Sequence, residues 1–124
     1  MNENRPSMKI VMIDDEEPII ESTMSFLADE GFITEGFSSH EQALAYIEHD
    51  PPNICLIDYR MPNVNAEELI QLIKQTNPDI RCLIYTGVAI TLSDTLKQLG
   101  LSESDIIQKP IIDFDSFISL LRRQ

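Results

Sequence analysis

Basic residues are scarce in this 124-residue chain. Nine Lys and Arg stand against 21 Asp and Glu, which gives a formal net charge of −12 at pH 7. Because affinity for DNA comes mainly from Lys and Arg contacts with phosphates, we expect no direct binding to nucleic acid. Carboxylates instead bind hard cations such as Mg²⁺ or Ca²⁺, although most of these acids are expected only to aid solubility.

Cysteines are also few. Cys55 and Cys82 each lie within a short apolar run, and no CxxC or Cys/His spacing points to zinc. Nothing else in the sequence argues for the oxidising compartment that a disulfide needs. We therefore expect two buried free thiols.

Long apolar runs and targeting signals are missing. The chain holds no apolar run of 18 residues, and its first residues lack the charged, apolar and small-residue regions of a signal peptide. We expect no membrane span and a cytoplasmic protein. No repeat or linker divides the chain, so we predict a flexible tail over residues 1–7 and one folded domain over 8–124.

Short apolar runs alternate with helical patterns along the whole chain. Strands are predicted at residues 8–13, 32–37, 54–57, 80–85 and 106–107. Helices are predicted from Pro18 to Gly31, from a cap at Ser38 or Ser39 to Pro51, over 66–73, over 89–99 with Gly100 as the stop, and after a cap at Asp113. Residues 61–63 are expected to be a loop. This alternation predicts an α/β fold with a doubly wound parallel sheet and helices on both faces.

Chemically useful residues follow four of these strands: Asp14 with Asp15, then Asp58, Thr86 and Lys109. Ligands of open parallel sheets bind outside the carboxyl ends of the strands, so these side chains should share one edge. Carboxylates gathered there repel each other by roughly 4 kcal/mol per pair at 4 Å and an effective dielectric of about 20. A cation is therefore expected, and Mg²⁺ suits oxygen ligands and phosphates.

A carboxylate can also act as the nucleophile in phosphoryl transfer and form an aspartyl phosphate. Asp58 has no acidic neighbour in sequence and lies centrally, so we predict that it is the nucleophile. Asp14 and Asp15 are then predicted metal ligands, direct or through water. Lys109 offers a positive charge and Thr86 a hydroxyl to the incoming group.

In this order and spacing, over residues 8–124, the sequence resembles the receiver domain of two-component response regulators. The matching pieces are Asp14-Asp15 after an apolar strand, Asp58 in IDYRMPN, Thr86-Gly87 after a strand, and Lys109-Pro110. The resemblance implies a flavodoxin-like and CheY-like sheet of five strands in the order 2-1-3-4-5. It also implies a cis Lys109–Pro110 bond.

The resemblance further implies a role for each site residue. Asp58 would accept the phosphoryl group from a histidine kinase or a phosphotransfer protein. Mg²⁺ would be held by Asp15, Asp58 and the backbone carbonyl of Arg60, with Asp14 assisting through water. Lys109 would pair with the phosphoryl oxygens, and Thr86 would move toward them.

Two positions depart from the family pattern. Ile106 stands where an aromatic residue is usual, and Ala66 stands where a glycine is usual. We expect Thr86 and Ile106 to form the switch, in which an isoleucine can repack but cannot hydrogen-bond. The switched face, made of the fourth helix, fifth strand and fifth helix, is expected to bind a downstream protein, and a homodimer is left open.

The leading interpretation is a phosphorylation-dependent switch that slowly hydrolyses its own aspartyl phosphate and is not a metabolic enzyme. A docking module that keeps the fold but signals without phosphorylation is the alternative, and Ile106 favours it. A phosphatase would need a second Asp where Arg60 stands, and a flavin carrier would need a non-acidic loop after the first strand. Because no output domain follows, a stand-alone regulator or an excised receiver is expected.

Overall fold

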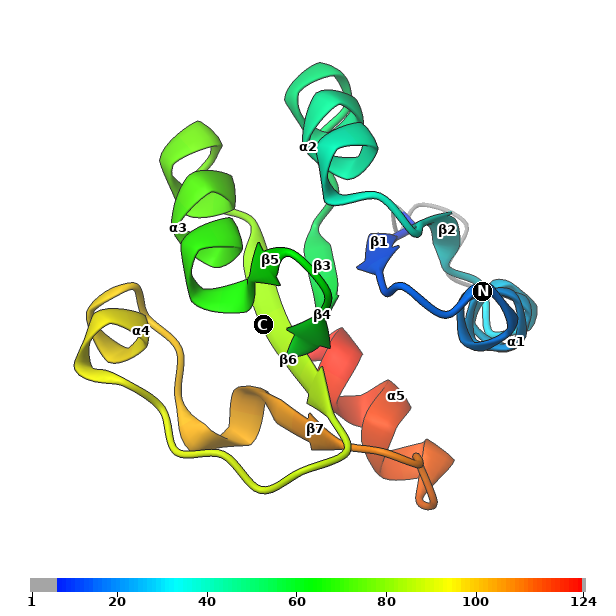
Figure 1. The fold of residues 1–124 in the computed structure, drawn as a ribbon. Coiled ribbons are helices and arrows are strands. Elements are labelled where there is room, and N and C mark those ends of the chain that lie inside the picture. The colour runs from blue at the N-terminus through cyan, green and yellow to red at the C-terminus, as the bar shows by residue number, and fades with distance from the viewer. Residues whose placement is uncertain (1–6, 124) are drawn as a thin grey trace.

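Five parallel strands form a single sheet between two layers of helices in the computed structural model, which describes residues 7–123 (Figure 1). Its strands are β1 (Lys9–Ile13), β2 (Ile33–Phe37), β3 (Ile54–Asp58), β6 (Arg81–Thr86) and β7 (Ile106–Gln108). They lie in the order β2-β1-β3-β6-β7, which is 2-1-3-4-5 when only the strands of this sheet are counted. The predicted fold class and strand order are therefore confirmed. The tail predicted over residues 1–7 falls, except for Ser7, outside the described residues.

Helices cover both faces of the sheet, as predicted. They are α1 (Glu17–Asp29), α2 (His40–His49), α3 (Ala66–Thr76), α4 (Asp94–Gln98) and α5 (Phe114–Arg122). Helices α1 and α5 pack on one face, and α2, α3 and α4 on the other (Figure 1). Successive residues of β1 alternate between the two cores, Val11 on one side and Met12 on the other. This burial on both faces explains why the strands read as continuous apolar runs.

Side-chain caps fix where several helices begin. Ser39 accepts a hydrogen bond from the Gln42 amide, and Asp113 accepts one from the Ser116 amide, which confirms both predicted caps. Gly31 and Gly100 follow α1 and α4 with φ values of 97° and 99°, a backbone conformation that glycine adopts without a steric penalty. Both glycines thus stop their helices, as expected.

The loop expected at residues 61–63 is in fact the turn of a short hairpin. Strands β4 (Arg60–Met61) and β5 (Val64–Asn65) pair antiparallel, with Arg60 opposite Asn65. Proline at the second turn position and a positive φ of 63° at Asn63 match a type II turn. This ladder fixes the backbone immediately after Asp58.

The helix predicted over residues 89–99 is wrong in its first half. Only Asp94–Gln98 is helical, and the residues before Ser93 form an irregular segment. The β-branched residues Val88, Ile90 and Thr91 favour a helix weakly, whereas Ser93 caps α4 by accepting from the Leu96 amide. A 3₁₀ turn over Glu103–Asp105 before β7 was not predicted.

Both thiols are buried and free, as predicted. Cys55 on β3 lies in register with Cys82 on β6. Among residues 7–123, none of the helices has the length and apolar character that crossing a bilayer requires.

Candidate functional site

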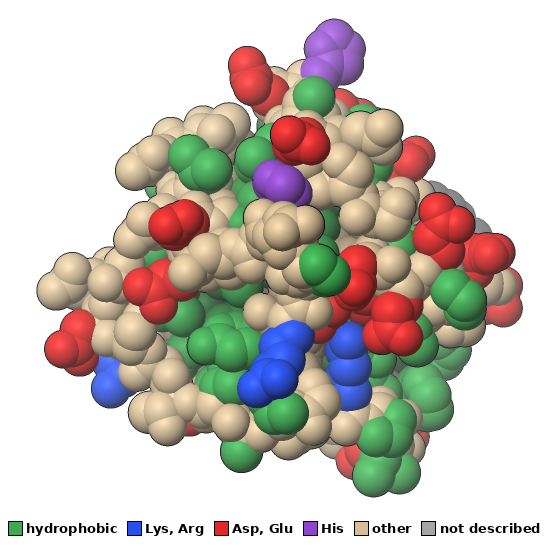
Figure 2. Space-filling view, viewed as in Figure 1, with side chains coloured by type: hydrophobic (Ala, Val, Ile, Leu, Met, Phe, Trp, Pro, Cys, Tyr) green, Lys and Arg blue, Asp and Glu red, His purple; other side chains and the backbone are tan. Residues whose placement is uncertain are grey.

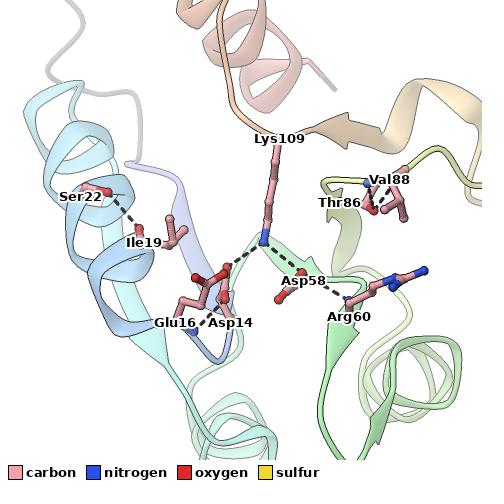
Figure 3. A network of polar contacts seen from close by, with 9 residues as sticks. All are labelled: Asp14, Glu16, Ile19, Ser22, Asp58, Arg60, Thr86, Val88 and Lys109. Atoms are coloured by element: carbon pink, nitrogen blue, oxygen red, sulfur yellow. Dashed lines mark hydrogen bonds and ion pairs between the residues drawn. The ribbon is translucent and has the colours of Figure 1, made fainter.

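Three charged side chains from separate strand ends meet at one edge of the sheet (Figure 3). Ile13 lies in register with Ile57, so the neighbouring strands β1 and β3 bring Asp14 and Asp58 to adjacent positions. Lys109 follows β7, and its Nζ lies 3.1 Å from Oδ1 of Asp58 and 3.4 Å from Oδ2 of Asp14. The convergence that the sequence predicted for these residues is thus present, and the Lys109–Pro110 bond beside it is cis.

Burial makes this charge cluster electrostatically strong. Asp14 is fully buried and Asp58 is 4% exposed. Burial, and then the nearby charge of Asp14, raises the pKa of Asp58, while Lys109 opposes that rise. Burial alone would lower the pKa of Lys109, but its hydrogen bond to Asp58 and the charge of Asp14 outweigh burial and raise it. The lysine is therefore held as a cation between two carboxylates.

The two oxygens of the Asp58 carboxylate differ in their surroundings. Oδ1 accepts hydrogen bonds from Lys109 Nζ and from the Arg60 amide, the latter at 3.3 Å. Oδ2 accepts none from the described residues. Because every fully buried side-chain oxygen among these residues has a partner, Oδ2 must retain contact with solvent. One oxygen is fixed and the other is open to a reactant.

Tyr85 helps to position Lys109, a role that the sequence reading missed. The Lys109 ammonium lies 4.7 Å from the centroid of the Tyr85 ring, a cation–π distance. The Lys109 amide also donates to the Thr86 carbonyl at 2.7 Å. Tyr85 immediately precedes Thr86, so the two side chains point to opposite faces of the sheet. This alternation along the strand is the one feature of the sequence that could have indicated different roles for Tyr85 and Thr86.

An acidic cluster adjoins the buried pair. One carboxylate oxygen from each of Asp14, Asp15 and Glu16 can lie within 4.8 Å of the others, and Asp15 and Glu16 are exposed. The donor set consists entirely of oxygens, beside the partly free carboxylate of Asp58, which fits a hard divalent cation such as Mg²⁺. The predicted ligands Asp14 and Asp15 thus lie where such an ion could bind.

Thr86 ends β6 and is buried beside the site, yet its hydroxyl is turned to its own loop (Figure 3). Oγ1 donates to the Val88 carbonyl at 3.0 Å and accepts from the Val88 amide at 3.1 Å. Ile106 lies half-buried on the same face of the sheet, since Ile84 pairs with Ile106 and Thr86 with Gln108. The two predicted switch residues therefore share one face.

Arg60 contributes its backbone rather than its side chain to the buried cluster. Its amide binds Asp58, whereas its exposed guanidinium points away from Asp58 (Figure 3). Over the strand ends, acidic side chains gather beside basic ones (Figure 2). The mouth of the site thus carries both signs of charge.

The profile of the response regulator receiver domain matches residues 10–122. The chain belongs to this family. The resemblance inferred from the motifs is therefore confirmed.

Curated relatives of this receiver domain are regulatory proteins. The regulatory protein VanRc of Enterococcus gallinarum is 33% identical over 104 residues, which cover 84% of this chain and 44% of that protein. The response regulator SaeR of Staphylococcus aureus is 27% identical over 82% of this chain and 43% of its own length. The chain thus spans about half the length of the curated relatives that it matches.

Solved structures agree with this fold. A response regulator receiver domain protein (CheY-like) from Methanospirillum hungatei is 26% identical, with a TM-score of 0.80 over 94% of this chain and 92% of that one. A response regulator protein from Burkholderia pseudomallei, 21% identical, superposes with a TM-score of 0.79 over 94% of this chain and 67% of that one. It was solved with a phosphorylated aspartic acid and a calcium ion.

Proposed function

We propose that this receiver domain, folded over residues 8–124, accepts a phosphoryl group on Asp58 and switches a surface that binds a partner. One observation carries the proposal: a buried carboxylate ends the central strand, with one oxygen fixed by Lys109 and the other open to solvent. A carboxylate with both oxygens bound by protein groups could not attack a phosphoryl donor. The phosphorylated aspartic acid in the Burkholderia protein of the same fold supports the proposal.

The proposed reaction is a transfer between a phosphohistidine and Asp58. Oδ2 of Asp58 attacks the phosphorus atom, the bond from phosphorus to the donor imidazole nitrogen breaks, and the imidazole leaves with the electron pair. Lys109 Nζ, fixed by Tyr85 and Asp14, balances the negative charge of the transferring group. The donor is a histidine kinase or a phosphotransfer protein. Water later hydrolyses the aspartyl phosphate, which releases inorganic phosphate and returns Asp58 to the carboxylate.

The metal in this proposal is Mg²⁺, which would be held by Asp15, Asp58 and the backbone carbonyl of Arg60, with Asp14 assisting through water. When bound, Mg²⁺ neutralises charge on the phosphoryl oxygens. Glu16 extends the acidic donor set toward solvent. The hairpin of β4 and β5 holds the Arg60 backbone next to Asp58.

The switch would begin at Thr86. A phosphoryl group adds about −1.5 to −2 charges and three strong acceptors, which compete with Val88 for the Thr86 hydroxyl. A shift of Thr86 leaves room for Ile106 on the same face to repack. The altered face, formed by α4, β7 and α5, then binds a downstream protein or a second copy of the chain, in a cytoplasmic signalling pathway.

Acetyl phosphate tests this function. The chain is incubated with acetyl phosphate and Mg²⁺ and its intact mass is measured, with Asp58→Asn as the control and EDTA as the metal-free arm. We expect one added phosphoryl group on the native chain and none on Asp58→Asn or with EDTA. If the native chain takes up neither a phosphoryl group nor beryllofluoride, the site does not accept phosphate, and the phosphorylation-independent docking module replaces this proposal.

A further inference from the structure

A hydrogen bond between two helices closes the loop that follows Thr86. Ser93 Oγ donates to Oε2 of Glu67 at 2.7 Å, across 26 residues of sequence. Both side chains are partly buried. Ser93 is the N-cap of α4 and Glu67 lies in the first turn of α3, so this contact joins the starts of two helices.

The segment between Thr86 and Ser93 has no regular structure of its own. It is tied at one end by the two hydrogen bonds between Thr86 and Val88, and at the other by the Ser93 contact with Glu67. Leu92, only 4% exposed, is inserted into the core between these ties. Because the segment is short and held at both ends, a movement at Thr86 can be transmitted to the contact between Ser93 and Glu67.

Glu67 is also connected to Asp58 along the other side of the site. The Arg60 amide binds Asp58, Arg60 pairs with Asn65, and Asn65 caps α3 through the Glu68 amide. Glu67 is the second residue of that helix. Two routes thus link Asp58 to the contact between Glu67 and Ser93. One runs through the hairpin, and the other runs through Lys109, whose amide donates to the Thr86 carbonyl, and then along the loop.

We infer that the hydrogen bond between Glu67 and Ser93 is a brace that holds the β6–α4 loop in its unphosphorylated arrangement. While the brace is intact, the Thr86 hydroxyl remains hydrogen-bonded to Val88 and does not reach Asp58. Without the brace, the loop can leave Thr86 more readily. Glu67 and Ser93 are therefore positioning residues that set how easily the switch operates, an inference that rests on the proposed phosphoacceptor function for its effect but not for its structure.

The first test needs no phosphoryl group. Amide hydrogen exchange of Val88 is measured by NMR in the native chain and in Glu67→Ala, with Glu68→Ala as the matched control. Glu68 is the same residue type in the same helical turn, and its side chain is exposed. Losing a hydrogen bond to a charged group, which contributes roughly 1.5–3 kcal/mol, should speed exchange at least about tenfold in Glu67→Ala, while Glu68→Ala stays within about twofold of native.

A second variant separates the brace from the cap. Ser93→Asp keeps an N-cap acceptor for α4 but sets a carboxylate against Glu67, so it should reproduce the faster Val88 exchange. Combined with Glu67→Ala, it should add nothing further, because the same contact has already been lost. Equal Val88 exchange in Glu67→Ala and Glu68→Ala, or native exchange in Ser93→Asp, would overturn the brace.

The final readout is the apparent affinity for beryllofluoride with Mg²⁺. We expect about fivefold tighter binding by Glu67→Ala than by the native chain, because the loop of the variant leaves its unphosphorylated arrangement at a lower free-energy cost. Glu68→Ala should bind as the native chain does. If the native chain binds beryllofluoride and Glu67→Ala binds it no more tightly, the brace is contradicted. If no variant binds beryllofluoride, the phosphoacceptor function is contradicted, and the hydrogen-exchange results alone decide on the brace.

Discussion

The Lys109 ammonium lies over the ring of Tyr85, 4.7 Å from its centroid, while it binds Asp58. Tyr85 is 5% exposed, and burial raises the pKa of its hydroxyl, so the ring stays neutral at physiological pH. The lysine is thus fixed by an aromatic face on one side and by carboxylates on the other.

This relationship predicts that the ring of Tyr85 matters more than its hydroxyl. Tyr85→Phe should be labelled by acetyl phosphate at a rate within about twofold of native. Tyr85→Leu should be about fivefold slower, since a cation–π contact contributes roughly 1 kcal/mol to holding the lysine. Initial rates from intact mass spectrometry measure both. Equal rates for Phe and Leu would show that the ring does not position Lys109.

Neutralising the buried acid should stabilise the fold. In Asp58→Asn, repulsion from Asp14 disappears, at roughly 4 kcal/mol for a close pair, while a charge-assisted bond worth roughly 1.5–3 kcal/mol is weakened. We expect a net gain of about 1 kcal/mol in the unfolding free energy at pH 7. Urea unfolding in EDTA measures it, with Asp79→Asn, an exposed acid, as the control. A loss of stability would contradict the repulsion argument.

Arg60 should lengthen the life of the aspartyl phosphate. Its exposed guanidinium stands at the mouth of the site, where it can turn toward the phosphoryl oxygens and hinder water. An exposed ion pair contributes about 0.2–1 kcal/mol, so Arg60→Ala should shorten the lifetime by up to about fivefold. The decay of labelled protein measures it, with Arg123→Ala as the control. An unchanged lifetime in Arg60→Ala would discard this role.

The two thiols should be unreactive in the folded protein. Burial raises the pKa of Cys82 to about 12 and that of Cys55 well above its usual range, so almost no thiolate forms at pH 8. We expect no alkylation by iodoacetamide under native conditions and two alkylated cysteines in guanidinium, read by intact mass. Rapid labelling without denaturant would show that β3 and β6 separate easily.

Much of the site could be predicted because it is encoded by short sequence patterns at the strand ends. Apolar runs that end abruptly at Asp14 and Asp58 mark buried strands, and the rule that ligands bind at the carboxyl ends of parallel strands brings their tips together. Lys109 follows from the same rule. The predicted roles of these residues remain predictions, since position alone does not show phosphorylation.

The segments that could not be predicted depend on contacts across the sequence. The hydroxyl of Thr86 binds Val88 because of the path of the loop, and that path depends on Ser93 meeting Glu67. The contact of Tyr85 with Lys109 joins two strands in the same way. Pro62 and Asn63 do read as a turn, but only the pairing of Arg60 with Asn65 makes that turn a hairpin.

The pairing of Arg60 with Asn65 has a practical consequence for engineering. Since the hairpin itself dictates the path of the main chain at position 60, its amide should reach Asp58 with any residue except proline at that position. The outward-facing side chain can then be changed to adjust the lifetime of the aspartyl phosphate. A panel of substitutions at this one codon could yield signals that fade quickly or slowly from the same scaffold.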